Sequence, residues 1–580
     1  MSKLNIDQQT VRELFENKKS DFLIPDYQRP YAWGEEECET LWDDIFLFAF
    51  PNENCNDFDE NNNEYFLGPI VTFKNEDGKL EIIDGQQRLT TLMLLLRAFY
   101  SKFENTRDEH SKTIIENIAR CIWKTDEFGI PNKEKLKINS EVATDDDKNE
   151  FLYILREGTI NNNHKSRYAK VFQFFENKIN DFVNTYPSYI AYLPVRILNN
   201  CILLPIEAES QDTALRIFST LNDRGKPLSD TDIFKAQLYK FYSSMDKKEE
   251  FIDRWKKLEE ICDDIFRVSS GSSMDELFTR YMYYERAKQG NKNTTTEALR
   301  KFYEKDKYVL LKKEETLNNL ENLANFWNDV ENQNEDVFSQ RILKKLFVLS
   351  YAPNSMWTYL VSVYFLHYKD KDCMLNEEKF YLFLDKITAY ILGYAFVNPG
   401  VNALRTPAYP EMIKIVNNIQ ADFSKNKIEK NRLKKILEDY SFTNVKPITK
   451  SMLAWWMYYN KEQNLVNLET RFEIEHIFAK KRQEVENSLK NEKKLDAIGN
   501  KAFLEKNVNI RAADYRFADK KRYYKGFINN NGKEKKGTQN KELLNLSDIT
   551  IDFNESNIDD RTNVIITNFI NYLDDNDLFE

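Results

Sequence analysis

One short stretch of the chain places a strand, a turn and a helix in direct succession. Residues 80–83 (Leu-Glu-Ile-Ile) alternate with polar neighbours in the manner of a strand, and Asp84 and Gly85 follow as turn formers. The run at 89–96 (Leu-Thr-Thr-Leu-Met-Leu-Leu-Leu) then predicts an apolar helix. We therefore expect an α+β fold around a strand-turn-helix junction.

The junction gathers groups that suit a phosphate. A helix N-terminus presents unpaired N–H groups and a positive dipole end, Gly85 lets a ligand approach the backbone, and Arg88 carries a forked donor. The alternative is structural, with Asp84 capping the helix and Arg88 solvated.

Two other segments share this mixture of residues. Residues 24–33 (Ile-Pro-Asp-Tyr-Gln-Arg-Pro-Tyr-Ala-Trp) form a proline-bracketed, extended stretch before a predicted helix at about 35–48. Residues 217–229 (Ile-Phe-Ser-Thr-Leu-Asn-Asp-Arg-Gly-Lys-Pro-Leu-Ser) lead into a further predicted helix that contains Asp232.

Together these motifs resemble the N-terminal domain of the GmrSD-type modification-dependent restriction enzymes and of related phosphorothioate-sensing defence nucleases. The resemblance spans about residues 1–240 and implies a ParB- or sulfiredoxin-like domain that hydrolyses a nucleoside triphosphate (GTP, UTP, CTP or ATP) and recognises modified DNA. The chain has no Walker A segment, so the nucleotide site would be of the family's own kind. The implied nucleotide-binding residues are Asp84, Gly85, Gln86, Gln87 and Arg88, with Asn222 and Asp232 as weaker candidates. Tyr27, Gln28 and Arg29 would line the same pocket or contact the DNA.

A second group of residues lies in the last fifth of the chain. His476 follows Glu475, and Asn500 and Asn509 come after it. Histidine titrates near neutral pH and suits the removal of a proton from water during phosphodiester hydrolysis. The chain holds only 4 histidines, so a metal would depend on oxygen ligands such as Glu475 and Asn509, which favours magnesium or manganese over zinc.

These residues resemble the HNH branch of the His-Me-finger nucleases, over roughly 60 residues. The resemblance implies a ββα-metal core in which His476 is the general base, Glu475 and Asn509 are metal ligands, and Asn500 orients the base. Two positions depart from the family pattern, because Glu475 stands where Asp is common and Ala479 where Pro is frequent. The alternative is a structural Glu-His pair on an apolar strand.

Local charge favours a nucleic-acid partner for this region. Residues 471–541 contain 19 Lys plus Arg against 10 Asp plus Glu, an excess of +9 in a chain of net charge −11. Interleaved aromatic residues make such a patch attractive to a phosphate backbone, although a solvated surface remains the alternative. The expected backbone contacts are Lys480, Lys481, Arg511, Lys520, Lys521 and Lys525.

The length of 580 residues predicts several domains. We expect a sensor domain at 1–240, an all-α connecting region at 241–450 and the nuclease domain at 451–580, in a predominantly helical α+β protein. The chain shows neither an apolar signal core at its N-terminus nor an uninterrupted apolar run of membrane-spanning length, and its 6 cysteines form no Cys-x-x-Cys pair. We expect a cytoplasmic protein that binds DNA, with a homodimer as a possible assembly and no membrane partner.

The function that we infer from both motif groups is an NTP-regulated, metal-dependent endonuclease that cuts or nicks modified phage DNA in bacterial defence. The alternative is a nucleotide-dependent DNA-binding switch protein whose nuclease domain is inactive. A third option is an RNase, because a metal-dependent core alone does not identify the sugar.

Overall fold

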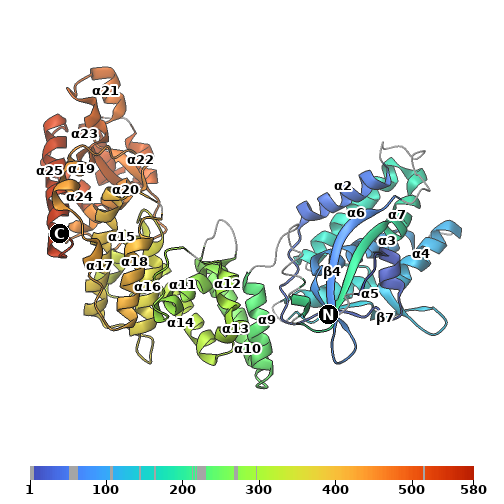
Figure 1. The fold of residues 1–580 in the computed structure, drawn as a ribbon. Coiled ribbons are helices and arrows are strands. Elements are labelled where there is room, and N and C mark those ends of the chain that lie inside the picture. Colours follow the sequence, from blue (N-terminus) through green and yellow to red (C-terminus); the bar gives the residue numbers. More distant parts are fainter. Residues whose placement is uncertain are drawn as a thin grey trace. The chain divides into compact units, whose positions relative to one another are not determined.

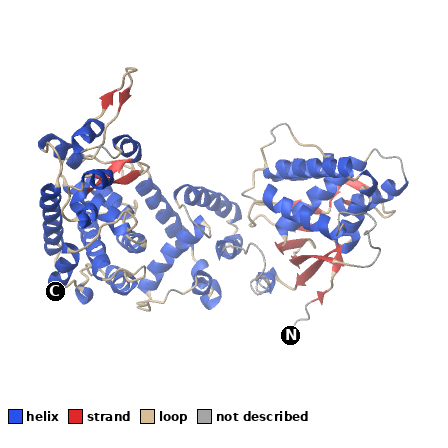
Figure 2. Cartoon of the chain, turned by 90° about the horizontal axis from the view of Figure 1, so that it is seen from above, coloured by secondary structure: helices blue, strands red, loops and turns tan. Residues whose placement is uncertain are grey.

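The chain consists of two compact units, Met1–Lys256 and Lys257–Glu580 (Figure 1). The computed structural model describes residues 5–50, 63–104, 109–142, 145–161, 165–211, 213–215, 217, 230–266, 272–295, 297–400, 402–513 and 516–580. Helices predominate in both units (Figure 2), which confirms the predicted helix-rich α+β class. The helices that follow residue 257 and the predicted nuclease segment pack within the same unit.

The first unit is built on a mixed sheet with strand order β1-β9-β4-β5-β3-β8, and β2 also pairs with β9. Parallel pairing joins β3 to β5 and β8, and β4 to β9, whereas β4 and β5 are antiparallel. The strands are β1 (Asn5–Ile6), β2 (Gln9–Thr10), β3 (Phe22–Ile24), β4 (Tyr65–Lys74), β5 (Leu80–Asp84), β8 (Ile138–Ser140) and β9 (Cys201–Ala208). A separate small sheet consists of β6 (Trp123–Thr125) and β7 (Pro131–Leu136).

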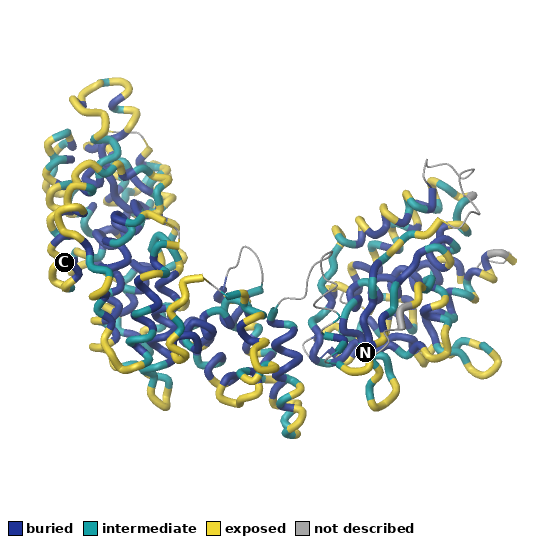
Figure 3. Tube along the Cα trace, viewed as in Figure 1, coloured by how far each residue is buried: buried dark blue, intermediate teal, exposed yellow. Residues whose placement is uncertain are grey.

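The helix α3 (Gln86–Phe103) forms the centre of the core in this unit. Its residues from Leu89 to Tyr100 are all buried, as expected for a helix that is apolar on every side. It packs against α4 (Glu109–Ile122), α5 (Lys148–Glu157) and α6 (Arg167–Thr185). The buried segments gather in the interior of the unit (Figure 3). The remaining helices are α1 (Val11–Glu16), α2 (Glu35–Ala49), α7 (Tyr192–Asn200), α9 (Asp230–Ser243) and the first part of α10 (Lys248–Ile265).

The second unit begins as a helical array and ends in a smaller α+β part. The array contains α11 (Ser273–Lys288), α12 (Leu299–Tyr303), α13 (Lys305–Tyr308), α14 (Glu314–Glu331), α15 (Gln340–Ser350), α16 (Met356–Tyr368), α17 (Glu377–Val397), α18 (Arg405–Val416), α19 (Lys430–Glu438) and α20 (Pro447–Tyr459). Among the described residues α17 alone is long and apolar enough to cross a membrane, and 67% of its most apolar window is buried in the protein, as in a core helix.

The α+β part follows α20. Its elements are β10 (Phe472–His476), α21 (Lys480–Glu486), β11 (Lys501–Glu505), α22 (Lys506–Ala512), α23 (Phe517–Lys525), β12 (Phe527–Ile528), β13 (Glu534–Lys535), α24 (Lys541–Ile549) and α25 (Glu555–Asp575). A core of its own, which includes Ile477, Leu504 and Tyr524, holds these elements together.

Candidate functional site

His476 is the last residue of β10, which pairs with β11 in antiparallel register so that His476 lies opposite Lys501. The helix α22 begins directly after β11. The strand pair and the helix after it are compatible with the ββα core expected around His476, with α21 between the two strands, and the HNH assignment stays a prediction. Asn509 lies on that helix and Asn500 lies immediately before β11.

Asn500 fixes the backbone that follows His476. Its fully buried amide donates to the carbonyl oxygens of Phe478 and Leu495, each at 3.1 Å, and accepts from the Phe478 N–H at 2.7 Å. Its backbone carbonyl accepts from the Ile477 N–H at 2.9 Å. Asn500 thus sets the path of the chain after His476, and none of these contacts is to the imidazole ring.

The turn that carries Asn500 is held from the opposite side by α25. Arg561 donates to the carbonyl oxygens of Gly499 at 2.8 Å and Lys501 at 2.7 Å, and it pairs with Glu542 at 2.8 Å. A Cβ on Gly499 would lie 2.2 Å from the Ile558 carbonyl oxygen, so only glycine allows α25 to approach this closely.

The imidazole of His476 contacts a buried lysine. Lys501 Nζ lies 2.5 Å from His476 Nε2 and also donates to Asp496 at 2.9 Å and Asn444 at 3.0 Å. Burial, together with the positive charges of Lys501 and Lys480, lowers the pKa of His476 to about 3. The ring is therefore neutral at physiological pH, with Nε2 accepting the hydrogen bond. Sequence reasoning missed Lys501, Asp496 and Asn444, although the position of Lys501 opposite His476 in the strand pair is what brings it here.

Glu475 points to the other face of β10, because successive strand residues alternate. Its Oε1 accepts from Lys520 Nζ and from the Tyr524 hydroxyl, each at 2.6 Å, and all three side chains are buried. Lys520 also donates to the His476 carbonyl oxygen at 2.7 Å. Burial raises the pKa of Tyr524 well above its ordinary value, and the charge of Glu475 adds to this effect.

The lysines and the arginine that were predicted to contact the DNA backbone differ in their surroundings. Lys520 was expected to meet phosphate, but its side chain is only 1% exposed because it is the ion-pair partner of Glu475, so that expectation is corrected. Lys480 and Lys481 are exposed, Lys521 is half-buried over the Phe517 ring, and Lys525 is exposed beside Asp548. Arg511 donates to the Lys536 carbonyl oxygen.

The residues around Glu475 do not fit a divalent cation as they are arranged. Asn509 donates to Glu473 at 2.9 Å, on the same face of β10 as Glu475. The charge of Glu475 is matched by a buried ammonium, which would repel a cation bound at the same carboxylate. Within the described part of the chain, no group of three or more His, Cys, Asp or Glu residues is placed to hold a metal ion.

In the first unit the segments 24–33 and 84–88 meet at the C-terminal ends of β3 and β5. Strands β3 and β5 run parallel, with Phe22 opposite Leu80, so the segments that follow them leave the sheet side by side. Glutamine side chains join the two segments. Gln86 donates to the Arg29 carbonyl oxygen at 2.8 Å, and Gln87 accepts from the Ala32 N–H at 2.6 Å.

Two further residues of the segment 24–33 form hydrogen bonds to β5. Gln28 donates to the carbonyl oxygen of Ile82 at 3.2 Å, and the buried Tyr27 donates to Glu81 at 3.1 Å. Gln28, Tyr27, Gln86 and Gln87 therefore hold the motifs to each other.

The charged residues of these motifs gather next to the start of α3. Gly85 has a φ of +94° and leads directly into the helix, and its N–H donates to Asp84 at 2.8 Å. Burial raises the pKa of Asp84, and the neighbouring Arg88 and Arg29 oppose that rise. Arg88 is largely buried and donates to the Pro69 carbonyl oxygen at 2.8 Å, whereas Arg29 is half-exposed.

The two weaker candidates for the nucleotide site are Asp232 and Asn222. Asp232 lies in the first turn of α9 and is half-buried. Asn222, with the rest of residues 218–229, lies outside the described residues.

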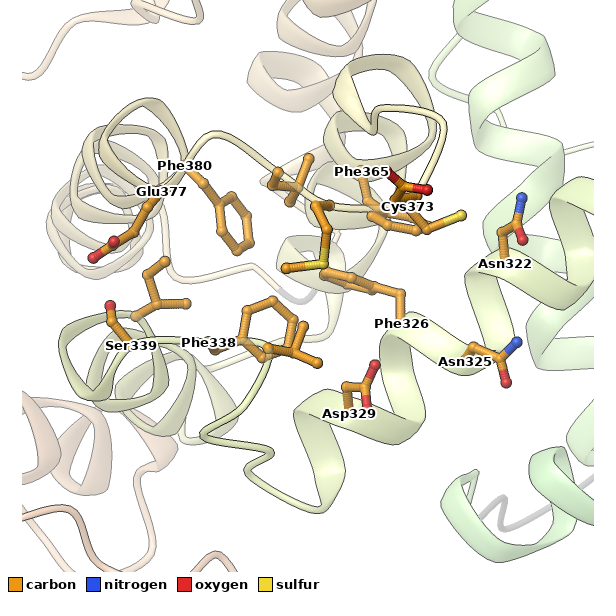
Figure 4. A pocket seen from close by; sticks show the side chains of 15 residues that line it. Asn322, Asn325, Phe326, Asp329, Phe338, Ser339, Phe365, Cys373, Glu377 and Phe380 are labelled. Atoms are coloured by element: carbon orange, nitrogen blue, oxygen red, sulfur yellow. The ribbon is translucent and has the colours of Figure 1, made fainter.

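A cavity of about 370 Å³ lies among α14, α15, α16 and α17 of the second unit and is lined by no residue of either motif group. Figure 4 shows the rings of Phe326, Phe338, Phe365 and Phe380 gathered in it, with Asp329 toward its margin. These four phenylalanines are at most 5% exposed, so the cavity is bounded mainly by core side chains.

Comparison with known proteins assigns the first unit. Residues 11–239 match the family model described as "GmrSD restriction endonuclease, N-terminal domain". The match includes all three N-terminal segments that carry the resemblance and ends before the helical array and His476. A search of curated proteins gave no match.

Proposed function

We propose that this chain, whose residues 11–239 match the N-terminal domain of the GmrSD restriction endonucleases, is a DNA endonuclease of bacterial defence and that His476 is its general base. The observation that supports the proposal is the antiparallel β10–β11 pair followed by α22, with Asn500 fixing the backbone that follows His476. The family implies DNA as the substrate. We propose that this DNA is modified phage DNA and that the protein acts in the cytoplasm.

His476 supplies the base in this proposal. Its imidazole is neutral at physiological pH and is free to take a proton from water once Nε2 is released from Lys501. The proton then resides on Nε2, the water oxygen attacks the phosphorus of the scissile diester, and the P–O bond to the leaving nucleotide breaks. The leaving oxygen takes a proton from solvent water, and His476 returns its own proton to solvent. The neighbouring exposed Lys480 and Lys481 are placed to attract the DNA backbone.

The HNH resemblance implies a requirement for magnesium or manganese. No step of the mechanism above depends on the ion, and the cleavage experiment tests for it. Glu475 is occupied by Lys520 in this structure, so a cation there requires that ion pair to open. The requirement is decided by measuring cleavage with each ion and with a chelator.

We also propose that the group formed by Asp84, Arg88 and Arg29 is the site at which a nucleoside triphosphate acts. Arg29 is the half-exposed cation of this group and suits a phosphate, and the N-terminus of α3 adds unpaired N–H groups. Nucleotide binding there would act on the loop that Gln86 and Gln87 attach to α3.

The test uses purified protein with modified and unmodified phage DNA, with and without magnesium, manganese and each of the four triphosphates. His476→Ala should abolish cutting and leave NTP hydrolysis intact, because the two groups of residues lie in different units. His367→Ala is the matched control, since His367 is a half-buried histidine of the same unit that contacts Asn418. Parental cutting by His476→Ala would overturn the assignment of the base.

A DNA-binding switch without nuclease activity is the second candidate. It is favoured by one observation, which is that buried lysines contact both His476 and Glu475. Binding of DNA without nicking under every condition above would support it. A parallel arm with RNA substrates tests the RNase alternative, and size-exclusion chromatography tests the proposed homodimer.

A further inference from the structure

A short hairpin extends from the part of the second unit that contains His476. Strands β12 and β13 pair with Phe527 opposite Lys535, and Figure 2 shows a short strand pair projecting beyond the helices of this unit. The tip is well closed. Asn529 N–H donates to the Lys533 carbonyl oxygen at 3.0 Å, and the Asn529 side chain accepts from the Lys533 N–H at 2.8 Å.

The base of the hairpin is fixed to the helices beside the candidate nuclease site. A Cβ on Gly537 would lie 2.2 Å from the Tyr524 carbonyl oxygen, so the returning strand lies directly against the end of α23. Thr538 N–H donates to the same carbonyl at 2.8 Å, and Arg511 of α22 donates to the Lys536 carbonyl oxygen. The hairpin therefore has a defined direction relative to α22 and α23.

This attachment places the hairpin close to His476. Lys520 of α23 donates to the His476 carbonyl oxygen, and the hairpin begins just after Lys525, which ends that helix. At a rise of 1.5 Å per residue, the five residues from Lys520 to Lys525 span only about 8 Å. The hairpin thus begins about one and a half helical turns from the residue that contacts the His476 backbone.

The surface of the hairpin carries groups that no intramolecular role explains. Lys533 and Lys536 are exposed and Lys535 is half-buried, and in the described structure none of the three ammonium groups forms an ion pair. Ile528 is 69% exposed, and the tip residues Asn530 and Asn531 are exposed as well. The hairpin from 526 to 537 has three lysines against one glutamate, a net charge of +2.

We propose that the β12–β13 hairpin enters a groove of duplex DNA and positions the strand that is cut. This inference rests on the proposed endonuclease function and names an element that contacts its substrate. A two-stranded ribbon fits the major groove, which is about 12 Å wide. The lysines contact phosphates on either side, while the amides of Asn530 and Asn531 face base edges, where asparagine pairs with adenine.

The first experiment measures binding alone. In the His476→Ala background, a fluorescein-labelled 30-bp duplex is titrated by anisotropy at several salt concentrations for the parent and for Lys533→Ala/Lys535→Ala/Lys536→Ala. If all three lysines contact phosphates, the slope of log K against log salt should fall by about 2.7, because each contact contributes about 0.9. The affinity should fall at every salt concentration, whatever the sequence of the duplex.

The matched control removes the same charge from the same unit. Lys371→Ala/Lys434→Ala/Lys435→Ala replaces three exposed lysines outside the hairpin, and it should leave the salt slope unchanged. Far-UV circular dichroism and thermal unfolding should match the parent for both triple variants, since the replaced side chains support no core.

The asparagines are tested separately. Asn530→Ala/Asn531→Ala should keep the parental salt slope and reduce the difference in affinity between duplexes of different sequence. In cleavage assays with His476 intact, the lysine variant should raise KM for DNA and keep kcat at saturating DNA.

The outcomes separate the two proposals. An equal affinity and salt slope for the parent and the lysine variant would overturn the hairpin proposal even if the parent cuts DNA. Hairpin-dependent binding by a parent that cuts no DNA would overturn the endonuclease and leave the hairpin assignment standing. Hairpin-dependent binding that prefers RNA to duplex DNA would overturn the choice of partner.

Discussion

Glu475 and Lys520 form a buried ion pair whose contribution to stability can be measured. Their side chains are 4% and 1% exposed, and Lys520 Nζ lies 2.6 Å from Glu475 Oε1. Removing one partner leaves an uncompensated charge in a buried site, which typically costs about 3–5 kcal/mol. We therefore expect Glu475→Gln and Lys520→Met each to lower the free energy of unfolding of the second unit by about that amount.

The double variant distinguishes this mechanism from a general loss of packing. With both charges gone, the main remaining loss is the hydrogen bond from Lys520 to the His476 carbonyl oxygen, worth about 1 kcal/mol. The double variant should then be at least about 3 kcal/mol more stable than the sum of the single effects predicts. Urea unfolding followed by far-UV circular dichroism measures all four proteins of the cycle.

An exposed pair in the same part of the chain is the control. Lys481 and Glu484 lie 2.8 Å apart with side chains 61% and 62% exposed, and such pairs contribute about 0–1 kcal/mol. A cycle on Lys481→Met and Glu484→Gln should show a coupling below about 1 kcal/mol. If the Glu475–Lys520 cycle shows an equally small coupling, our reasoning is refuted and the carboxylate is available to a metal ion.

Three further predictions follow from individual contacts. Lys501→Met should raise the pKa of His476 from about 3 toward its ordinary value near 6.5, as measured by NMR titration of the imidazole; an unmoved titration would contradict the contact. Because the unfolded chain takes up the proton first when the folded pKa is depressed, the parent should lose stability as the pH falls from about 6.5 to 3, and the variant should lose less. Asn500→Ala leaves buried backbone groups without partners and should cost about 2–5 kcal/mol in urea unfolding; a cost below 1 kcal/mol would show that water replaces the amide. Gln87→Ala should speed hydrogen exchange in the loop at 30–33 without changing exchange in the core of α3, and uniform protection would exclude the proposed attachment.

The local structure could be predicted from the sequence because it depends on neighbouring residues. The strand predicted at 80–83 is β5, and the helix predicted at about 35–48 is α2, which ends at Ala49. The helix predicted from the run at 89–96 begins earlier, at Gln86, because Gly85 adopts a positive φ and starts it. Periodicity and turn formers are sufficient for such segments.

Long-range partners could not be predicted in the same way. The attachment of Gln87 to Ala32 depends on the parallel pairing of β3 and β5, which no local pattern specifies. Lys501 and Lys520 are a harder case, since lysine is almost never fully buried and its presence in a basic segment indicates solvent or phosphate. Their burial follows from the strand register and from the packing of α23 against β10.

The contact of Arg561 with the turn before β11 has a consequence for how the protein is made. In sequence, 60 residues separate the guanidinium from the Lys501 carbonyl oxygen that it holds. A ribosome adding about 5–20 residues per second needs roughly 3–12 s to cover that interval. During that time a nascent chain contains His476 and Asn500 without the side chain that secures the turn between them. Prematurely terminated copies that lack Arg561 remain in this state, so we expect their turn before β11 to be held less firmly than in the full chain.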